Sequence, residues 1–102
     1  MKFVNLTPHA ISLNCGTTFP PSGIVARVST RHTPFDGDGI AELSFGEVAD
    51  LPDPEEGTIY IVSGLVASAA KRADVVSPAT GHPDTVRNEK GHIVSVPGFV
   101  RA

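Results

Sequence analysis

The chain has 102 residues, a hydrophobic share of 40% and a formal charge of −3 at neutral pH. This size favours a single domain, residues 1–102, with a thin core, so we expect a homo-oligomer that hides further surface. The acidic balance argues against nucleic acid or an anionic membrane as a partner, because both attract positive charge. No segment has the length and apolarity of a membrane span, and the single cysteine excludes an internal disulfide. These features predict a soluble, cytoplasmic protein.

Short strands dominate the first half of the predicted structure. Apolar and polar residues alternate in several stretches, which is typical of half-buried strands. Pro8 ends the first of them, because proline donates no backbone hydrogen bond. A turn at residues 14–16 predicts that the second and third strands pair antiparallel. The expected strands are residues 2–6, 10–14, 17–19, 24–29 and 40–46, and residues 30–39 and 47–57 are expected to be loops.

The stretch 58–72 is the centre of the predicted fold. Residues 58–62 form an almost unbroken apolar, β-branched and aromatic run, which predicts the most buried strand of the chain. Alanine-rich residues follow Ser63 and Gly64, and they favour one short helix at about residues 64–72.

The last third returns to strands. Residues 73–76 predict a short strand, and residues 77–84 are rich in residues that break regular structure. Residues 85–87 and 92–96 predict a hairpin whose turn ends at Gly91. The fold class that follows is mainly β (α+β), a small antiparallel sheet or barrel with one short helix.

The junction between the central strand and the helix is the first candidate site. Backbone N–H groups at a helix start have no partner within the helix, and they favour anions. Ser63, Gly64 and Leu65 would offer such groups, together with one hydroxyl, to a phosphate or carboxylate. The commoner function of such a serine is to cap the helix, with the glycine fitting the turn.

Three further residues are candidates on either side of this junction. Tyr60 could stack on a base or sugar, or it could pack across the sheet. Arg72 could bind an anionic ligand, although a salt bridge with Asp74 is its default role. If the protein binds an anionic ligand, Tyr60, Arg72 and Asp74 are all predicted to contact it.

Thr7 and His9 flank a rigid proline, and they are candidates for hydrogen bonds to a ligand. The remaining histidines have no metal-ligand spacing, so we predict no metal site. Residues 36–39 contain two aspartates but lack the other ligands of a calcium loop. No Rossmann or P-loop motif is present, so we predict no cofactor.

Several stretches resemble a family of small proteins that phages, prophages and actinobacterial genomes encode. They include the motifs V-N-L-T-P-H near the start and E-G-T-I-Y-I-V-S in the middle. The resemblance implies a phage-linked cytoplasmic protein, and it transfers no activity to any residue. The stretches that carry it are residues 4–11, 20–23, 26–28, 56–63, 72–78 and 86–94.

Three functional hypotheses follow. The leading one is a non-enzymatic protein that binds and sequesters a small anionic, nucleotide-derived ligand, as an inhibitor of host defence would. The second is a protein–protein interaction or phage accessory module, which predicts a flat surface at Ser63. The third is a small hydrolase or isomerase that uses His9 with Asp74, and it requires those side chains to meet near Ser63.

Overall fold

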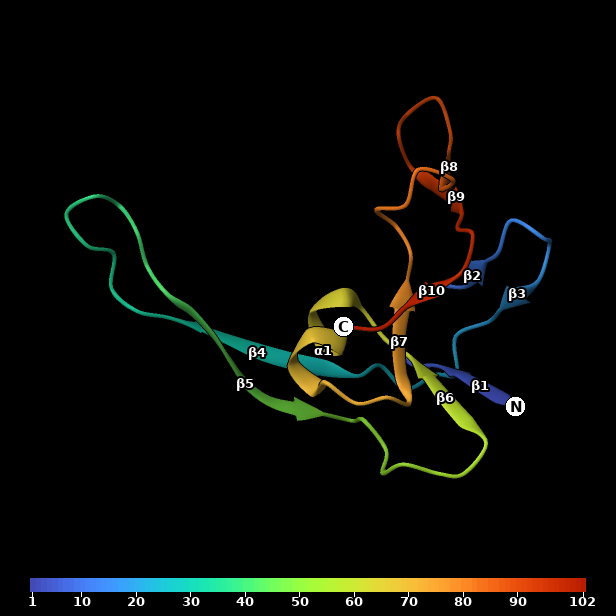
Figure 1. Cartoon of the computed structure of the whole chain (residues 1–102), viewed down its shortest axis with the longest axis horizontal. Helices are drawn as coiled ribbons and strands as arrows, with labels where there is room; N and C mark the ends of the chain where they lie inside the picture. Colours follow the sequence, from blue (N-terminus) through green and yellow to red (C-terminus); the bar gives the residue numbers. More distant parts are fainter.

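A four-stranded mixed sheet forms the centre of the molecule (Figure 1). The computed structural model describes residues 1–102. The first three strands of the sheet pair parallel, and the fourth pairs antiparallel with the third. Helix α1 (Gly64–Ala70) joins the second strand to the third. In spatial order the strands are β1 (Lys2–Asn5), β6 (Thr58–Ile61), β7 (Val75–Pro78) and β10 (Phe99–Val100).

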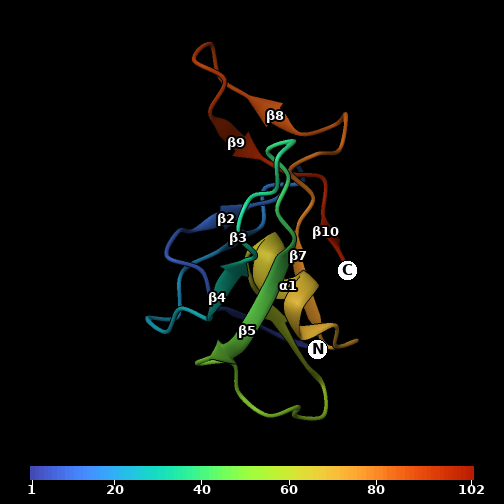
Figure 2. The same cartoon turned by 90° about the vertical axis from the view of Figure 1, so that its left-hand side faces the viewer.

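Three antiparallel ribbons surround the sheet (Figures 1 and 2). Two of them confirm the predicted hairpins, which pair residues near 10–14 with 17–19 and residues near 85–87 with 92–96. No pairing was predicted for the third. Its first strand is Arg27–His32 instead of residues 24–29, and its second is Leu43–Ala49 instead of residues 40–46. The ribbons are β2 (Ile11–Ser12) with β3 (Thr18–Phe19), β4 (Arg27–His32) with β5 (Leu43–Ala49), and β8 (Val86–Arg87) with β9 (Ile93–Ser95).

The predicted fold class, mainly β with one short helix, is confirmed. The antiparallel pairing that we expected throughout holds for the ribbons and for β7 with β10. It does not hold for β1, β6 and β7, which are parallel. All four residues of β6 are buried, and a strand covered on both faces is typical of a parallel sheet. A helix between two strands is also the usual parallel crossover.

The core lies on both faces of β6. On one face, Tyr60 and Val62 pack with residues of α1 and with Val75 of β7. On the other face, Ile59 and Ile61 pack with Val76 and with side chains of the β2–β3 ribbon. Three aromatic rings close this second face at centroid separations of 5.3 to 5.9 Å; they are Phe3, Phe19 and Phe99.

Helix α1 is short because both of its ends are capped. The Ser63 hydroxyl accepts a hydrogen bond from Val66 N at 3.3 Å, which satisfies one free N–H of the first turn. Lys71 adopts a left-handed conformation with φ of 50°, and its N–H donates to Ala67 O. The helix therefore ends at Ala70, before the expected residue 72. The chain has no helix with the length and apolar character needed to cross a bilayer.

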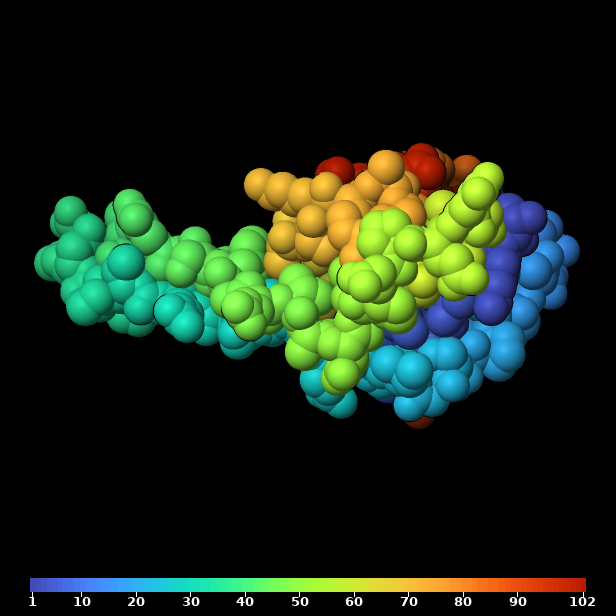
Figure 3. Space-filling model, turned by 90° about the horizontal axis from the view of Figure 1, so that it is seen from below, coloured from blue at the N-terminus to red at the C-terminus, as the bar shows by residue number.

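The ribbon of β4 and β5 projects from the rest of the molecule, and we call residues 27–49 the arm (Figures 1 and 3). Its hairpin pairing continues past the strands, because Thr33 N donates to Glu42 O and Asp36 N donates to Ile40 O. Asp36 Oδ1 also accepts two backbone N–H groups at the tip. The arm is therefore an ordered hairpin over its whole length, although residues 30–39 were expected to be loop.

Candidate functional site

A cavity of about 700 Å³ opens at the carboxyl ends of the parallel strands. Thr7 and His9 follow β1, Ser63 and Gly64 follow β6, and residues 77–82 continue from the end of β7. We call it the carboxyl-end cavity. In open sheets with parallel strands, ligands bind in the crevice beyond these ends.

The opposite wall of the carboxyl-end cavity comes from the ribbons. Residues 10–12 of the β2 region and residues 93–96 of β9 and its end contribute apolar side chains and two serine hydroxyls, and Val100 of β10 completes the wall. No lysine, arginine, aspartate or glutamate lines the cavity. The lining is therefore apolar surface with hydroxyl and imidazole groups, a composition typical of small-molecule sites.

Ser77 is the most informative polar group in this lining. The residue is 6% exposed and lines the cavity, and its hydroxyl takes part in none of the hydrogen bonds within the chain. No buried side-chain nitrogen or oxygen of the chain lacks a partner, so the Ser77 oxygen is open to the cavity, where water or a ligand can bond to it. The sequence placed Ser77 in an exposed loop, and only the pairing of β7 with β6 reveals its position.

The turn that carries Thr7 and His9 is held by Asn5, which is 3% exposed. The Asn5 side-chain amide donates to His9 O at 2.8 Å and to Phe19 O at 3.0 Å. Its oxygen accepts from Thr7 N at 2.9 Å, and the Thr7 hydroxyl lies 2.7 Å from it. Thr7 is itself buried within this network, so its main role is to shape the turn.

Asn5 is a positioning residue that the sequence analysis missed. The available signal was an amide side chain inside an apolar strand, directly before the proline turn. Such a residue is buried only when its polar atoms have partners, which makes it a candidate for a structural network.

Ser63 and Gly64, two of the predicted ligand contacts, line the cavity. A Cβ atom on Gly64 would meet nothing within 4 Å, so this residue faces open space. Helix α1 has only seven residues, and its dipole adds little to any anion site here. Leu65 points elsewhere and lines a smaller cavity of about 400 Å³ together with Val28 and Arg27 at the base of the arm.

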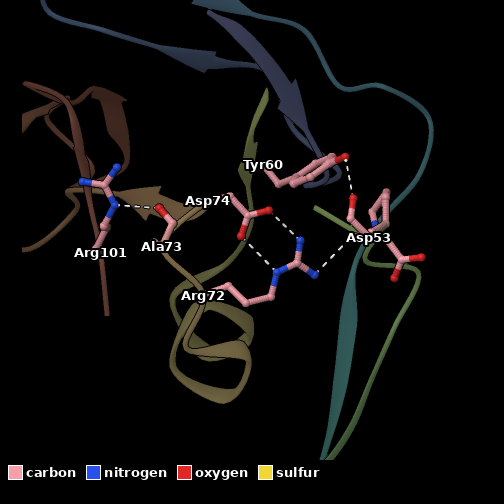
Figure 4. A network of polar contacts seen from close by, with 7 residues as sticks. Asp53, Tyr60, Arg72, Ala73, Asp74 and Arg101 are labelled. Atoms are coloured by element: carbon pink, nitrogen blue, oxygen red, sulfur yellow. Dashed lines mark hydrogen bonds and ion pairs between the residues drawn. The ribbon is translucent and has the colours of Figure 1, made fainter. Parts of the chain in front are cut away.

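Tyr60, Arg72 and Asp74 form a separate cluster at the other end of the sheet (Figure 4). Arg72 Nε and Nη2 donate to the two Asp74 carboxylate oxygens at 3.0 and 2.6 Å, and Nη1 donates to Pro52 O at 3.0 Å. The Tyr60 hydroxyl donates to Asp53 O at 3.3 Å, and the ring centroid lies 6.0 Å from Arg72 Cζ. Tyr60 is only 3% exposed, so its ring is not available for stacking on a ligand.

This ion pair shifts the pKa values of both partners. The hydrogen bonds from Arg72 lower the pKa of the Asp74 carboxyl, and those to Asp74 raise the pKa of Arg72, with burial opposing each shift. The Arg72 side chain is 26% exposed and that of Asp74 is 19% exposed, so the pair is partly shielded from water. The cluster fastens residues 52–53 to the amino end of β7. It is a structural joint and lies outside both cavities.

The eight predicted contacts thus divide into three places. Thr7, His9, Ser63 and Gly64 line the carboxyl-end cavity. Leu65 lines the smaller cavity, and the Tyr60–Arg72–Asp74 cluster is engaged in contacts of its own.

The two remaining hypotheses fit this geometry poorly. Asp74 directly precedes β7 and lies three residues before Ser77, which corresponds to about 10 Å along a strand. Asp74 is therefore well away from the cavity that His9 lines. The hydrolase hypothesis needs these two side chains in contact. The protein-module hypothesis expects a flat surface at Ser63, where the structure has a cavity.

Other reactive groups are isolated. No three His, Cys, Asp or Glu side chains come together in a group that could hold a metal ion. Cys15 is exposed in the turn between β2 and β3, where its contact with the Thr17 hydroxyl lowers its pKa.

The chain matches no protein-family model, no curated protein and no solved structure. The carboxyl-end cavity is therefore the main basis for a functional proposal.

Proposed function

We propose that this protein binds and sequesters a small, nucleotide-derived anionic ligand in the carboxyl-end cavity. The observation that carries the proposal is the cavity of about 700 Å³, with the Ser77 hydroxyl in its lining and free of hydrogen bonds within the chain. Cavities of about 300–1,000 Å³ are typical of sites that enclose a small molecule.

The lining supports a ligand with one flat apolar part and several hydroxyl or phosphate oxygens. Ile11, Ile93 and Val94 offer apolar surface to a ring, and Ser77 with Thr80 offers hydroxyl groups to a sugar or phosphate. Because no lysine or arginine lines the cavity, hydroxyl, imidazole and backbone N–H groups would meet the negative charge.

Binding without turnover is the better supported activity. In the cavity the Ser63 hydroxyl accepts from Val66 N, and His82 Nδ1 accepts from Asp84 N. No hydroxyl there is hydrogen-bonded to an imidazole, which is the arrangement that activates a serine nucleophile. The resemblance to phage-encoded proteins supports a place in the host cytoplasm, where sequestering a nucleotide signal would inhibit a defence response.

Two measurements test the proposal. Purified chain is denatured, and the small molecules that it releases are identified by mass spectrometry. The native chain is then titrated calorimetrically with ADP-ribose, cyclic ADP-ribose and a cyclic dinucleotide. We expect a released nucleotide, or binding of one member of the panel at one molecule per chain. The proposal is wrong if no nucleotide is released and the panel gives no heat at high concentration.

Matched glycine variants locate the site. Gly64→Gln extends a side chain into the open space beside the cavity, and it should abolish binding. Gly37→Gln is the control, since Gly37 also has nothing within 4 Å of its would-be Cβ but lies at the tip of the arm. Ser77→Ala should weaken binding about tenfold, because it removes one hydrogen bond to a charged ligand. Equal affinities for the two glutamine variants would contradict the assignment to this cavity.

A further inference from the structure

The arm has one apolar face and one polar face. On β4, Val28, Thr30 and His32 are two residues apart, so their side chains share a face. Val48, Phe45 and Leu43 stand opposite them on β5 and therefore lie on the same side. We call these six residues the arm stripe; they are Val28, Thr30, His32, Leu43, Phe45 and Val48.

The charged residues of the arm strands lie on the opposite face. Arg27 and Arg31 alternate with the arm stripe on β4, and Ser44 alternates with it on β5. The arm stripe contains no lysine, arginine, aspartate or glutamate. A ribbon with this division of faces is built to cover something on its apolar side.

The protein covers only the base of the arm stripe. Val28 and Val48 are half-buried against the core cluster that includes residues of α1. Further out, Phe45 is 40% exposed and Leu43 is 53% exposed. At the tip, Phe35 is 72% exposed. The face that begins in the core thus continues uncovered along the arm, which stands clear of the body in Figure 3.

An isolated two-stranded ribbon is marginally stable in water, so this length of arm needs packing from outside the chain. The residues 40–46 also alternate as a half-buried strand does, and the single chain does not bury them. Sequence pattern and burial agree only if another surface covers the arm stripe.

The chain as a whole exposes more surface than a compact monomer of its size. The accessible surface is 6781 Å², whereas a compact monomer of this mass exposes about 5,500 Å². The radius of gyration is 15.4 Å, against about 13 Å for a compact domain of this length. The excess is roughly 1,300 Å² per chain, which is enough for a stable homodimer interface at ~800 Å² per partner.

We propose that the arm stripe is a homodimerisation surface whose occupant is the arm stripe of a second copy of this chain. The two arms pack face to face about a two-fold axis, so the same uncharged patch meets itself. Phe45 and Leu43 of each copy lie at the centre of the interface, and the charged faces of both arms remain in water. The proposal is independent of the ligand site, because no arm-stripe residue lines the carboxyl-end cavity.

Sedimentation velocity of the full chain from 1 to 200 μM tests the proposal with two lysine variants. Phe45→Lys places a charge on the arm stripe. Ser44→Lys places the same charge on the neighbouring residue of the same strand, on the opposite face, where the side chain is also exposed. We expect a dimer for the wild type and for Ser44→Lys, and a monomer for Phe45→Lys.

Hydrogen exchange keeps the result interpretable if Phe45→Lys also loosens the arm. The amides of the core strand β6 should keep their protection in both variants, and only the arm of Phe45→Lys should exchange faster. A wild type that stays monomeric at 200 μM overturns the proposal, as does a dimer that survives Phe45→Lys. A monomer that co-sediments with phosphatidylcholine–phosphatidylglycerol vesicles would assign the arm stripe to a lipid surface instead.

Discussion

Arg72 and Asp74 form the one ion pair of the chain that joins a guanidinium to a carboxylate, with the two charged atoms 2.6 Å apart. The default interpretation of their spacing, a salt bridge, is the arrangement in the structure. Arg72 also donates a hydrogen bond to the backbone carbonyl of Pro52, and no sequence pattern indicates this contact. The guanidinium thus joins the connection before β6 to the turn before β7.

Asp74→Asn should lower the free energy of unfolding at pH 7 by about 1–2 kcal/mol, because it removes a partly buried, charge-assisted pair. The pKa of Asp74 is lowered on folding, so its contribution is complete above the unfolded pKa near 3.9 and disappears as pH falls through the lower folded value. Urea unfolding at pH 7 and pH 2 measures this: the two proteins should differ at pH 7 and converge at pH 2. Asp84→Asn is the control, since its contact with His82 is 3.9 Å long and exposed. A difference that persists at pH 2 would contradict the assignment.

Asn5 shows how a single amide can organise a turn. Asn5→Ala leaves two carbonyls and the Thr7 N–H without their partner, so we expect a loss of about 2–4 kcal/mol in the free energy of unfolding. Asn5→Asp keeps the acceptor but turns a carboxylate toward two carbonyls, and it should be at least as destabilising at pH 7. Chemical denaturation of both variants checks this. Wild-type stability in Asn5→Asp would show that the two donated bonds contribute little.

The arm bends where β5 has one residue more than β4. Val28 pairs with Val48 and Thr30 pairs with Phe45, so Gly46 and Glu47 together oppose Ser29 in a β-bulge. A Cβ atom on Gly46 would overlap the Ser29 hydroxyl. The φ of Gly46 is not positive, so the close approach of the Ser29 side chain, and not the backbone conformation, favours glycine here.

Gly46→Ala should loosen the arm, and the double variant Ser29→Ala/Gly46→Ala should restore it, because the second change removes the overlapping hydroxyl. Amide exchange in residues 30–45, together with thermal unfolding, measures both effects. We expect a coupling of about 1 kcal/mol between the two substitutions. Additive losses would mean that the overlap is relieved by a small backbone shift.

Local patterns predicted the strands and hairpins that are made within a short stretch of chain. The turn at residues 14–16, the Gly91 turn and the cap at Ser63 each depend on near neighbours, and each lies where expected. The start of the arm was misplaced, because residues 24–26 have strand-like composition but no partner strand beside them. Whether such a stretch forms a strand depends on a neighbouring strand to pair with, and local propensity carries no information about that neighbour.

The carboxyl-end cavity could be predicted only in part for the same reason. Ser63 and Gly64 were identified from their own neighbourhood. Ser77 and residues 79–82 reach the cavity only because β7 lies parallel to β6, and β9 closes the opposite wall through a bridge from Leu13 to Val96. Arg72 was assigned to the ligand from its charge and nearness in sequence, yet it lies at the amino end of the sheet.

The parallel pairing of β1 with β6 also has a consequence for how the chain folds. Residues 2–5 find their partners at residues 58–61, whereas each ribbon pairs residues that are close in sequence. Long-range pairings form late, because the entropy of closing the intervening loop is lost before the contacts compensate for it. The β6–α1–β7 unit can assemble without β1, so we predict that the hairpins fold first, this unit next, and β1 last. The turn held by Asn5, which is anchored on β1, therefore forms in the final step, and the carboxyl-end cavity is complete only in the fully folded chain.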